Sequence, residues 1–216
     1  MGLNKSTGNM YDFITHTWNT VKGKCPHNCS YCYVKRWGNQ PELHFDEKEL
    51  KTDLGSGNFI FVGSSCDMWA QDIPALWILE TLRHCGKFEY NKYLFQTKNP
   101  ANIRRILVYQ STVCVTIETN RWYADIMRNS PPIWQRIYHT QRLRHSPMIT
   151  IEPIIDFDLK EFVKMIKECA PFQVNIGADS GHNHLPEPPK DKILQLIEKL
   201  NKFTDVKQKS NLKRLL

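Results

Sequence analysis

Short apolar runs recur along the chain, and each is followed by a longer stretch with a different periodicity. The runs are rich in β-branched and aromatic residues and are too short for helices, which is typical of strands buried on both faces. They predict six strands: Phe13–Trp18, Phe59–Val62, Tyr93–Gln96, Val113–Ile117, Met148–Ile151 and Gln173–Ile176.

Between these runs, apolar residues lie three and four positions apart, which is the spacing of one face of a helix. Pro100 fits the first turn of such a helix, because a proline nitrogen carries no hydrogen that would stay unbonded there. Five helices are predicted: Pro74–His84, Pro100–Val108, Pro132–Leu143, Leu159–Cys169 and Lys190–Asn201.

Strands that alternate with helices predict parallel pairing through right-handed crossovers. The 216 residues fit a single domain, 1–216, with a basic C-terminal tail from about residue 204. At about 36 residues per βα unit, six units fill this length. We therefore expect an α/β fold with an open, partial parallel (β/α)6 barrel, and a doubly wound flat sheet is the competing architecture.

In both architectures, functional groups gather at the carboxyl ends of the strands. Polar or small residues follow five of the predicted strands: 63–67, 97–99, 118–120, 152–153 and 177–180. Each group alone is ordinary turn chemistry, because Asn, Asp, Gly and Ser favour turns. Five such groups at one edge indicate a site.

The formal net charge of +7 indicates an anionic partner, such as nucleic acid or a phosphorylated substrate, or else a solvated basic surface. Cations and aromatic residues cluster in three places near the expected barrel mouth. These are Lys22, Lys24, Lys35, Arg36 and Trp37; Arg121, Trp122 and Tyr123; and Lys207, Lys209, Lys213 and Arg214. Cations neutralise phosphates and aromatic faces stack on bases. The competing interpretation places Trp37 and Trp122 in the core and treats the tail as solubilising.

The chain has seven cysteines, three of which lie within eight residues. The sequence has no secretory signal and no apolar run near the ~20 residues that span a bilayer. We therefore expect reduced thiols, a cytoplasmic location and no membrane association. Cys66, Cys85, Cys114 and Cys169 are interpreted as core residues, since free cysteine is usually buried.

Cys25, Cys29 and Cys32 are spaced so that three thiolates can converge on one soft metal centre. An electron-transfer cluster usually takes four protein thiolates, so three would leave one iron open. The alternative is a tetrahedral zinc site completed by His27 or Cys66, in a nucleic-acid-binding module without catalysis.

The C-x3-C-x2-C spacing, with Tyr31 just before the third cysteine, resembles the signature of the radical S-adenosylmethionine (SAM) superfamily. More narrowly, the segments THTWNTVKGKCPHNCSYCYVKRWG, VGSSCDMW and FQTKNP resemble a small phage-associated radical SAM family whose substrate is poorly defined.

The resemblance implies a [4Fe–4S] cluster on Cys25, Cys29 and Cys32, with SAM bound at the open iron. A reductant protein of the flavodoxin or ferredoxin type would supply an electron. Reductive cleavage of SAM would then give methionine and a 5′-deoxyadenosyl radical, which abstracts hydrogen from the substrate.

The resemblance also implies SAM contacts. Gly63, Ser64 and Ser65 occupy the place of a Gly-Gly-Glu-like turn that faces the SAM amino group, and Asp67 stands in for its missing acid. Thr116 or Glu118 would contact the ribose, Lys98 would pair with the SAM carboxylate, and Tyr31 would flank the adenine. The expected substrate is a nucleic acid or nucleotide, and the alternative is a peptide or small metabolite.

Overall fold

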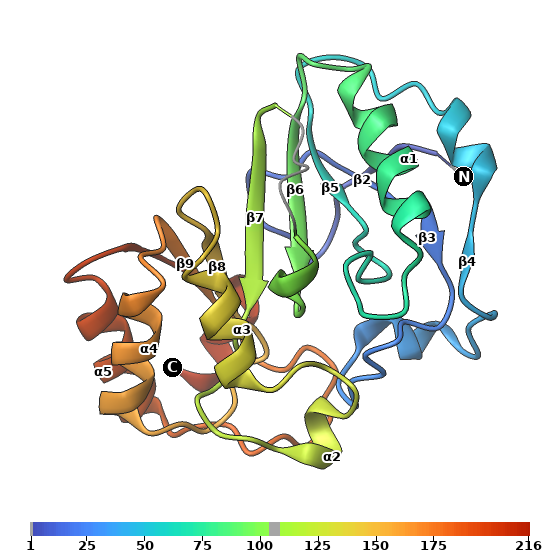
Figure 1. Ribbon diagram of the computed structural model, residues 1–216. Coiled ribbons are helices and arrows are strands. Elements are labelled where there is room, and N and C mark those ends of the chain that lie inside the picture. Colours follow the sequence, from blue (N-terminus) through green and yellow to red (C-terminus); the bar gives the residue numbers. More distant parts are fainter. Residues whose placement is uncertain (1, 104–108) are drawn as a thin grey trace.

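The structure, a computed structural model, describes residues 2–103 and 109–216. In these residues the main sheet has eight strands, in the order β1-β2-β5-β6-β7-β8-β9-β10 (Figure 1). They are β1 (Asn4–Lys5), β2 (His16–Trp18), β5 (Phe59–Val62), β6 (Lys92–Thr97), β7 (Ser111–Thr116), β8 (Met148–Ile151), β9 (Gln173–Ile176) and β10 (Asp205–Gln208). A separate antiparallel pair consists of β3 (Val21–Lys22) and β4 (His44–Phe45).

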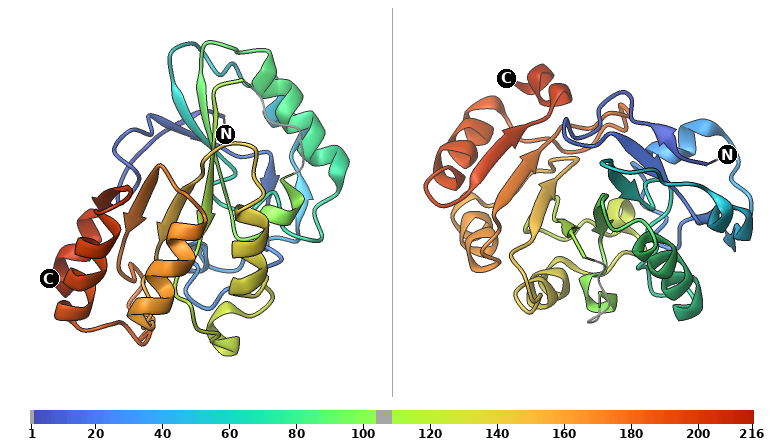
Figure 2. Two further views of the ribbon diagram at one scale, coloured as in Figure 1. Left: turned by 60° about the vertical axis from the view of Figure 1, so that its left-hand side comes forward. Right: turned by 90° about the horizontal axis from the view of Figure 1, so that it is seen from above.

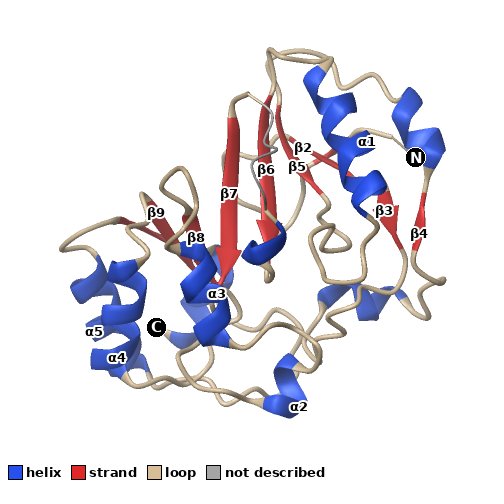
Figure 3. Ribbon diagram, in the orientation of Figure 1, coloured by secondary structure: helices blue, strands red, loops and turns tan. Residues whose placement is uncertain are grey.

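Helices α1, α3, α4 and α5 lie on the outer face of the curved sheet, with α4 next to α5 and α1 apart from the other three (Figures 2 and 3). The α-helices are α1 (Ala75–Gly86), α2 (Ala124–Met127), α3 (Ile133–Thr140), α4 (Leu159–Glu168) and α5 (Lys190–Leu200). Short 3-10 helices form at η1 (Tyr33–Trp37), η2 (Glu47–Lys51), η3 (Pro100–Asn102) and η4 (Ser210–Leu215). None of the described helices is long and apolar enough to cross a membrane.

The expectation of an open, partial parallel barrel is confirmed. All six predicted strands form, and each neighbouring pair from β2 through β9 is parallel. The sheet does not close, because β1, which pairs antiparallel with β2, and β10 form its two edges. A flat doubly wound sheet is excluded by the curvature and by the helices on one face (Figure 2).

The residues from about 204, described above as a basic tail, form β10 and η4. β10 pairs in parallel with β9, with Val206 opposite Val174. Its sequence, DVKQ, contains one apolar residue, so hydrophobic patterning carries no strand signal there. The pairing extends the barrel by one strand and brings Lys209 to the same end as the other strand termini.

Four of the five predicted helices form, with ends that agree to within three residues. In the fifth, Pro100–Val108, the first residues form η3, and residues 104–108 lie outside the described part of the chain. Pro100 does stand at the start of η3, as expected.

The core has two layers that follow from the alternation of side chains along each strand. Ile60, Val62 and Phe95 pack with α1 on the outer side. Phe61 and Leu94, one position away, point inward, where the N-terminal residue Tyr11 covers them. Because the inner cluster is small, it leaves the carboxyl ends of the strands open.

Candidate active site

A cavity of about 940 Å³ opens at the carboxyl ends of the parallel strands. Its walls come from the loops that follow β3, β5, β6, β8 and β9, from β7, and from the segment before β2. Cys25, Cys29 and Cys32 line one wall, and Glu152 and Lys209 belong to the same lining. Residues from four of the five polar groups expected at this edge therefore share one space, whereas none of residues 118–120 belongs to the lining.

The three cysteines occupy a loop between β3 and η1, and none of them forms a disulfide. Backbone turns fold this loop: the Asn28 N–H donates to the Cys25 carbonyl, and the Cys32 N–H donates to the Cys29 carbonyl. Asn28 has a φ of 49°, a left-handed conformation that Asn tolerates better than most residues. These turns hold the three thiols along one cavity wall.

Gly23 fixes the start of the cysteine loop. Its φ is 94°, and a Cβ there would lie 2.4 Å from the Glu42 carbonyl oxygen, so only glycine fits. The Lys24 N–H donates to the Pro41 carbonyl oxygen at 2.9 Å. The loop is thereby anchored to the segment that leads into β4.

Cys66 is buried, as expected for a core residue, but it also contacts the cysteine loop. A hydrogen bond from the Cys66 thiol lowers the pKa of Cys25, although burial acts in the opposite direction. Burial raises the pKa of Cys29. The structure thus favours the thiolate, which is the form that binds metals, at Cys25.

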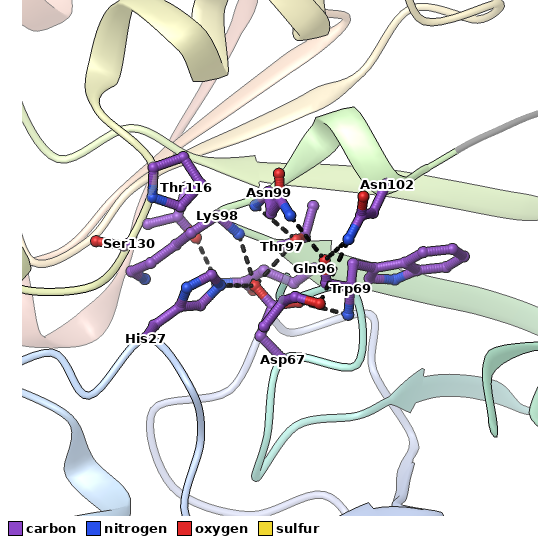
Figure 4. A network of polar contacts seen from close by, with 12 residues as sticks. His27, Asp67, Trp69, Gln96, Thr97, Lys98, Asn99, Asn102, Thr116 and Ser130 are labelled. Atoms are coloured by element: carbon purple, nitrogen blue, oxygen red, sulfur yellow. Dashed lines mark hydrogen bonds and ion pairs between the residues drawn. The ribbon is translucent and has the colours of Figure 1, made fainter. Parts of the chain in front are cut away.

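Asp67 is the centre of a network that joins three loops (Figure 4). Its carboxylate accepts from His27 Nε2 at 2.8 Å, from the Thr97 hydroxyl at 2.9 Å and from the Lys98 N–H at 2.8 Å. A fourth bond comes from the Trp69 N–H at 3.0 Å. Burial raises the pKa of Asp67, but His27 and the backbone donors outweigh it and keep the net pKa low. Asp67 therefore ties the cysteine loop to the ends of β5 and β6.

Glu118 is the centre of a second network. Its carboxylate accepts from Arg136 Nη1 at 2.7 Å and from the Tyr31 hydroxyl, and Lys98 Nζ lies 3.6 Å from it. Lys98 Nζ is also 5.4 Å from the centre of the Tyr31 ring. Burial raises the pKa of Glu118, but Arg136 and Lys98 together lower it below its usual value.

The electrostatic balance of this network favours the ionised forms of both Glu118 and Lys98. Burial lowers the pKa of Lys98, but the charge of Glu118, with a smaller contribution from Cys29, raises it overall. Burial and Glu118 both raise the pKa of Tyr31, so its hydroxyl stays protonated and donates. A fixed cation beside an aromatic ring therefore faces the cavity next to the cysteine loop.

The structure brings the predicted cofactor-contacting residues together around one end of the cavity. Gly63, Ser64, Ser65, Asp67, Tyr31, Lys98 and Thr116 all line it. Glu118 is completely buried beneath them and reaches the site through Tyr31 and Lys98. Thr116 accepts a hydrogen bond from Gln96 Nε2 at 3.1 Å.

Sequence reasoning missed two residues that hold this end of the cavity. Asn19 Oδ1 accepts from the Ser64 hydroxyl and from the Ser65 N–H, at 3.2 and 3.0 Å, which fixes the turn after β5. Arg136 on α3 pairs with Glu118. Arg136 lies on the apolar face of its helix with Ile133 and Ile137, and a charged residue in such a stripe is the signal that could have revealed it.

The predicted basic clusters have different environments. Six cations of these clusters form ion pairs with carboxylates. Lys22 binds Asp46 and Glu49, Lys24 binds Glu42, Arg121 binds Asp156 and Asp158, Lys207 binds Asp205, Lys209 binds Glu152, and Arg214 binds Glu187. Arg121 is therefore neutralised by two acids and is a poor candidate for a phosphate contact.

Lys35 and Arg36, on η1, have no acidic partner among the described residues. Their hydrogen bonds go to the carbonyl oxygens of Asn28 and Ser180. Trp37 follows them and is 65% exposed, so it is not a core residue. All three line the rim of the cavity. Trp122 is also half exposed, in a smaller hollow away from the cysteines.

No protein-family model matches the sequence, and no curated protein matches it. Solved structures of spore photoproduct lyase do match the fold. One variant is 9% identical, with a TM-score of 0.66, and the match covers 96% of this chain and 80% of that one. Another variant, with bound AdoMet and dinucleoside spore photoproduct, is 11% identical with a TM-score of 0.60. That match covers 94% of this chain and 66% of the other, so the chain spans just under two thirds of that protein's length.

At such low identity the similarity concerns the fold. The chain has the open, partial parallel barrel that the alternation of strands and helices predicts, and it shares this fold with spore photoproduct lyase. Its cysteine loop and cavity lie at the carboxyl ends of the barrel strands, where such folds carry their functional groups.

Proposed function

We propose that this chain is a radical SAM enzyme that holds a [4Fe–4S] cluster on Cys25, Cys29 and Cys32 and acts on a nucleic acid. The observation that carries the proposal is the placement of the three cysteines. They share one loop and line one wall of a large cavity, in a barrel that matches the fold of spore photoproduct lyase.

The donor set fits an iron–sulfur cluster better than a zinc ion. The described residues contain no group of three or more His, Cys, Asp or Glu side chains placed to hold one metal ion. A cluster relaxes this demand, because each thiolate binds a different iron. The two candidates for a fourth zinc ligand are His27, whose Nε2 bonds Asp67, and Cys66, which bonds Cys25. Three protein thiolates suit a cluster in which one iron stays open to another ligand.

When bound, the cluster and SAM supply a 5′-deoxyadenosyl radical that abstracts hydrogen from the substrate. The residues of this chain would bind and orient the cofactor. We propose that the turn Gly63–Ser65 contacts the amino end of SAM, that Lys98 pairs with its carboxylate and that Thr116 contacts its ribose. The Tyr31 ring would flank the adenine.

Asp67 and Glu118 take supporting roles in this proposal. Asp67 already accepts four protein hydrogen bonds, so it holds the cysteine loop against the ends of β5 and β6. Glu118 is fully buried and keeps Lys98 charged and Tyr31 oriented. Both acids would therefore act through neighbouring residues.

The proposed substrate is a nucleic acid. Lys35, Arg36 and Trp37 at the cavity rim combine cations for phosphates with an exposed ring for a base. Solved structures with this fold contain a dinucleoside spore photoproduct. A base within a duplex would have to be flipped out to enter the cavity.

Two further parts of the proposal follow from the chemistry. The cluster needs an electron, which we assign to a reductant protein of the flavodoxin or ferredoxin type. The free thiols fit a cytoplasmic location, because that compartment keeps cysteines reduced.

The test is anaerobic reconstitution followed by an assay for 5′-deoxyadenosine with SAM, a reductant and single-stranded or duplex DNA or RNA. We expect nucleic acid to stimulate release, and binding to weaken steeply as salt is raised, because phosphate contacts release counterions. SAM cleavage without stimulation, together with weak and salt-insensitive binding, would assign the enzyme to a peptide or small metabolite.

A further inference from the structure

The cavity has a second polar cluster besides the networks around the cysteine loop. It consists of Asn9, Glu152 and Lys209, which all line the cavity. Glu152 follows β8, Lys209 follows β10, and Asn9 comes from the N-terminal segment. In the sheet order, β8 and β10 lie towards one edge, whereas the cysteine loop follows β3 of the separate antiparallel pair.

Glu152 and Lys209 form an ion pair with little exposure. Lys209 Nζ donates to Glu152 Oε2 at 2.6 Å, and the two side chains are 9% and 18% exposed. Glu152 Oε1 accepts from Asn9 Nδ2 at 2.8 Å and from Asn211 Nδ2 at 3.1 Å. Lys209 Nζ also lies 4.5 Å from the centre of the Tyr11 ring. These contacts hold both charges at fixed positions.

Gly177 leaves room for the Glu152 carboxylate. A Cβ at this position would lie 2.6 Å from Glu152 Oε1 and 2.8 Å from Glu152 Cδ. Gly177 follows β9 directly and does not have a left-handed φ, so its backbone conformation does not require glycine. The absence of a side chain at Gly177 therefore leaves the space that the Glu152 carboxylate occupies.

Stability alone is a weak reason for this pair, because removing two charges from water offsets most of their attraction. Hydrogen-bonding capacity also remains among the described contacts. A carboxylate offers about four acceptor sites, and Glu152 uses three of them. An ammonium group has about three donors, and Lys209 uses one on Glu152. The second hydrogen of Asn9 Nδ2 is also available.

This remaining capacity selects a neutral ligand. A phosphate or carboxylate would be repelled by the negative charge of Glu152, and a cation would be repelled by the positive charge of Lys209. A group with one N–H between two carbonyl oxygens matches both: its N–H donates to Glu152, and its oxygens accept from Lys209 and Asn9. We infer that Asn9, Glu152 and Lys209 form a substrate subsite for an amide or imide edge.

In a nucleic acid, thymine and uracil present such an edge, whereas the corresponding ring nitrogen of cytosine accepts. This inference rests on the proposed function, in which a base enters the cavity. It adds a preference between bases that have the same sugar and phosphate.

The test compares binding of short single-stranded oligothymidylate and oligocytidylate of equal length to the reconstituted protein, by fluorescence anisotropy. We expect about tenfold tighter binding of the thymine strand, the effect of one well-placed base contact. Glu152→Gln should bring the ratio towards one. Gly177→Ala, which displaces only the flexible end of Glu152, should have the same effect.

The matched control is Glu187→Gln. Glu187 also binds a C-terminal cation, Arg214, and accepts from the Asp179 N–H, but it is not part of the cavity lining. It should leave the ratio unchanged. Equal binding of both strands by the wild type, or an unchanged ratio in Glu152→Gln, would overturn the inference. Asn9, Glu152 and Lys209 would then have a structural role only. Cluster content and 5′-deoxyadenosine release, measured on the same samples, report separately on the proposed function.

Discussion

Glu118 and Arg136 form an ion pair in which neither side chain has any exposed surface. Arg136 Nη1 donates to Glu118 Oε2 at 2.7 Å and to the Thr116 carbonyl oxygen at 3.0 Å. Arg136 Nη2 also donates to the Ser130 hydroxyl at 2.9 Å. The pair joins α3 to the end of β7 and sets the charge beside Lys98 and Tyr31.

Replacing Arg136 with methionine should destabilise the protein strongly. The substitution leaves the Glu118 charge buried with Lys98 as its remaining cation, and breaking a buried pair from one side costs about 3–5 kcal/mol. Chemical denaturation measures the free energy of unfolding. Arg83→Met is the control, because Arg83 pairs with Glu80 on the surface, where such pairs contribute about 0–1 kcal/mol. Equal losses in the two variants would contradict the role given to Arg136.

Much of the barrel could be predicted because its strands are short apolar runs and its helices have one apolar face. The three clustered cysteines could be identified from their spacing alone. Arg136 could not, because a charged residue in an apolar stripe finds its partner only in three dimensions. β10 was missed because its stability comes from backbone pairing with β9 and not from apolar side chains.

The cysteines illustrate the same limit. Cys66 is buried, as its residue type predicts, but its hydrogen bond to Cys25 depends on how the turn after β5 meets the cysteine loop. Asp67 is predicted to contact SAM, and the structure shows in addition four protein donors around its carboxylate. Sequence spacing can place a residue near a site, but it does not show which hydrogen-bond partners that residue has in the folded protein.

Replacing Asp67 with asparagine should loosen the cysteine loop. An amide group would place an NH2 among donors, and the lost bonds to a charged acceptor predict a loss of about 2–3 kcal/mol in unfolding free energy. Iron should also leave the reconstituted protein faster in the presence of a chelator. Asp72→Asn is the control, since Asp72 is exposed on a nearby loop. Unchanged stability and iron release in Asp67→Asn would refute this role.

Trp37 provides a test of the proposed nucleic-acid contact at the cavity rim. Trp37→Ala should weaken binding of single-stranded DNA or RNA by about tenfold, within the ~1–3 kcal/mol expected for one stacked base. Trp134→Ala is matched for exposure, 68% against 65%, but Trp134 does not line the large cavity. Equal effects of the two substitutions would place the binding surface elsewhere.

The central claim is tested most directly by the iron and inorganic sulfide content of anaerobically reconstituted protein. We expect four irons and four sulfides per chain in the wild type, the composition of a [4Fe–4S] cluster. Cys85→Ala, which removes a buried thiol on α1 far from the cysteine loop in sequence, should keep them. Cys29→Ala should lose both, together with all SAM cleavage. Stoichiometric zinc in the wild type, or a full cluster in Cys29→Ala, would contradict the assignment.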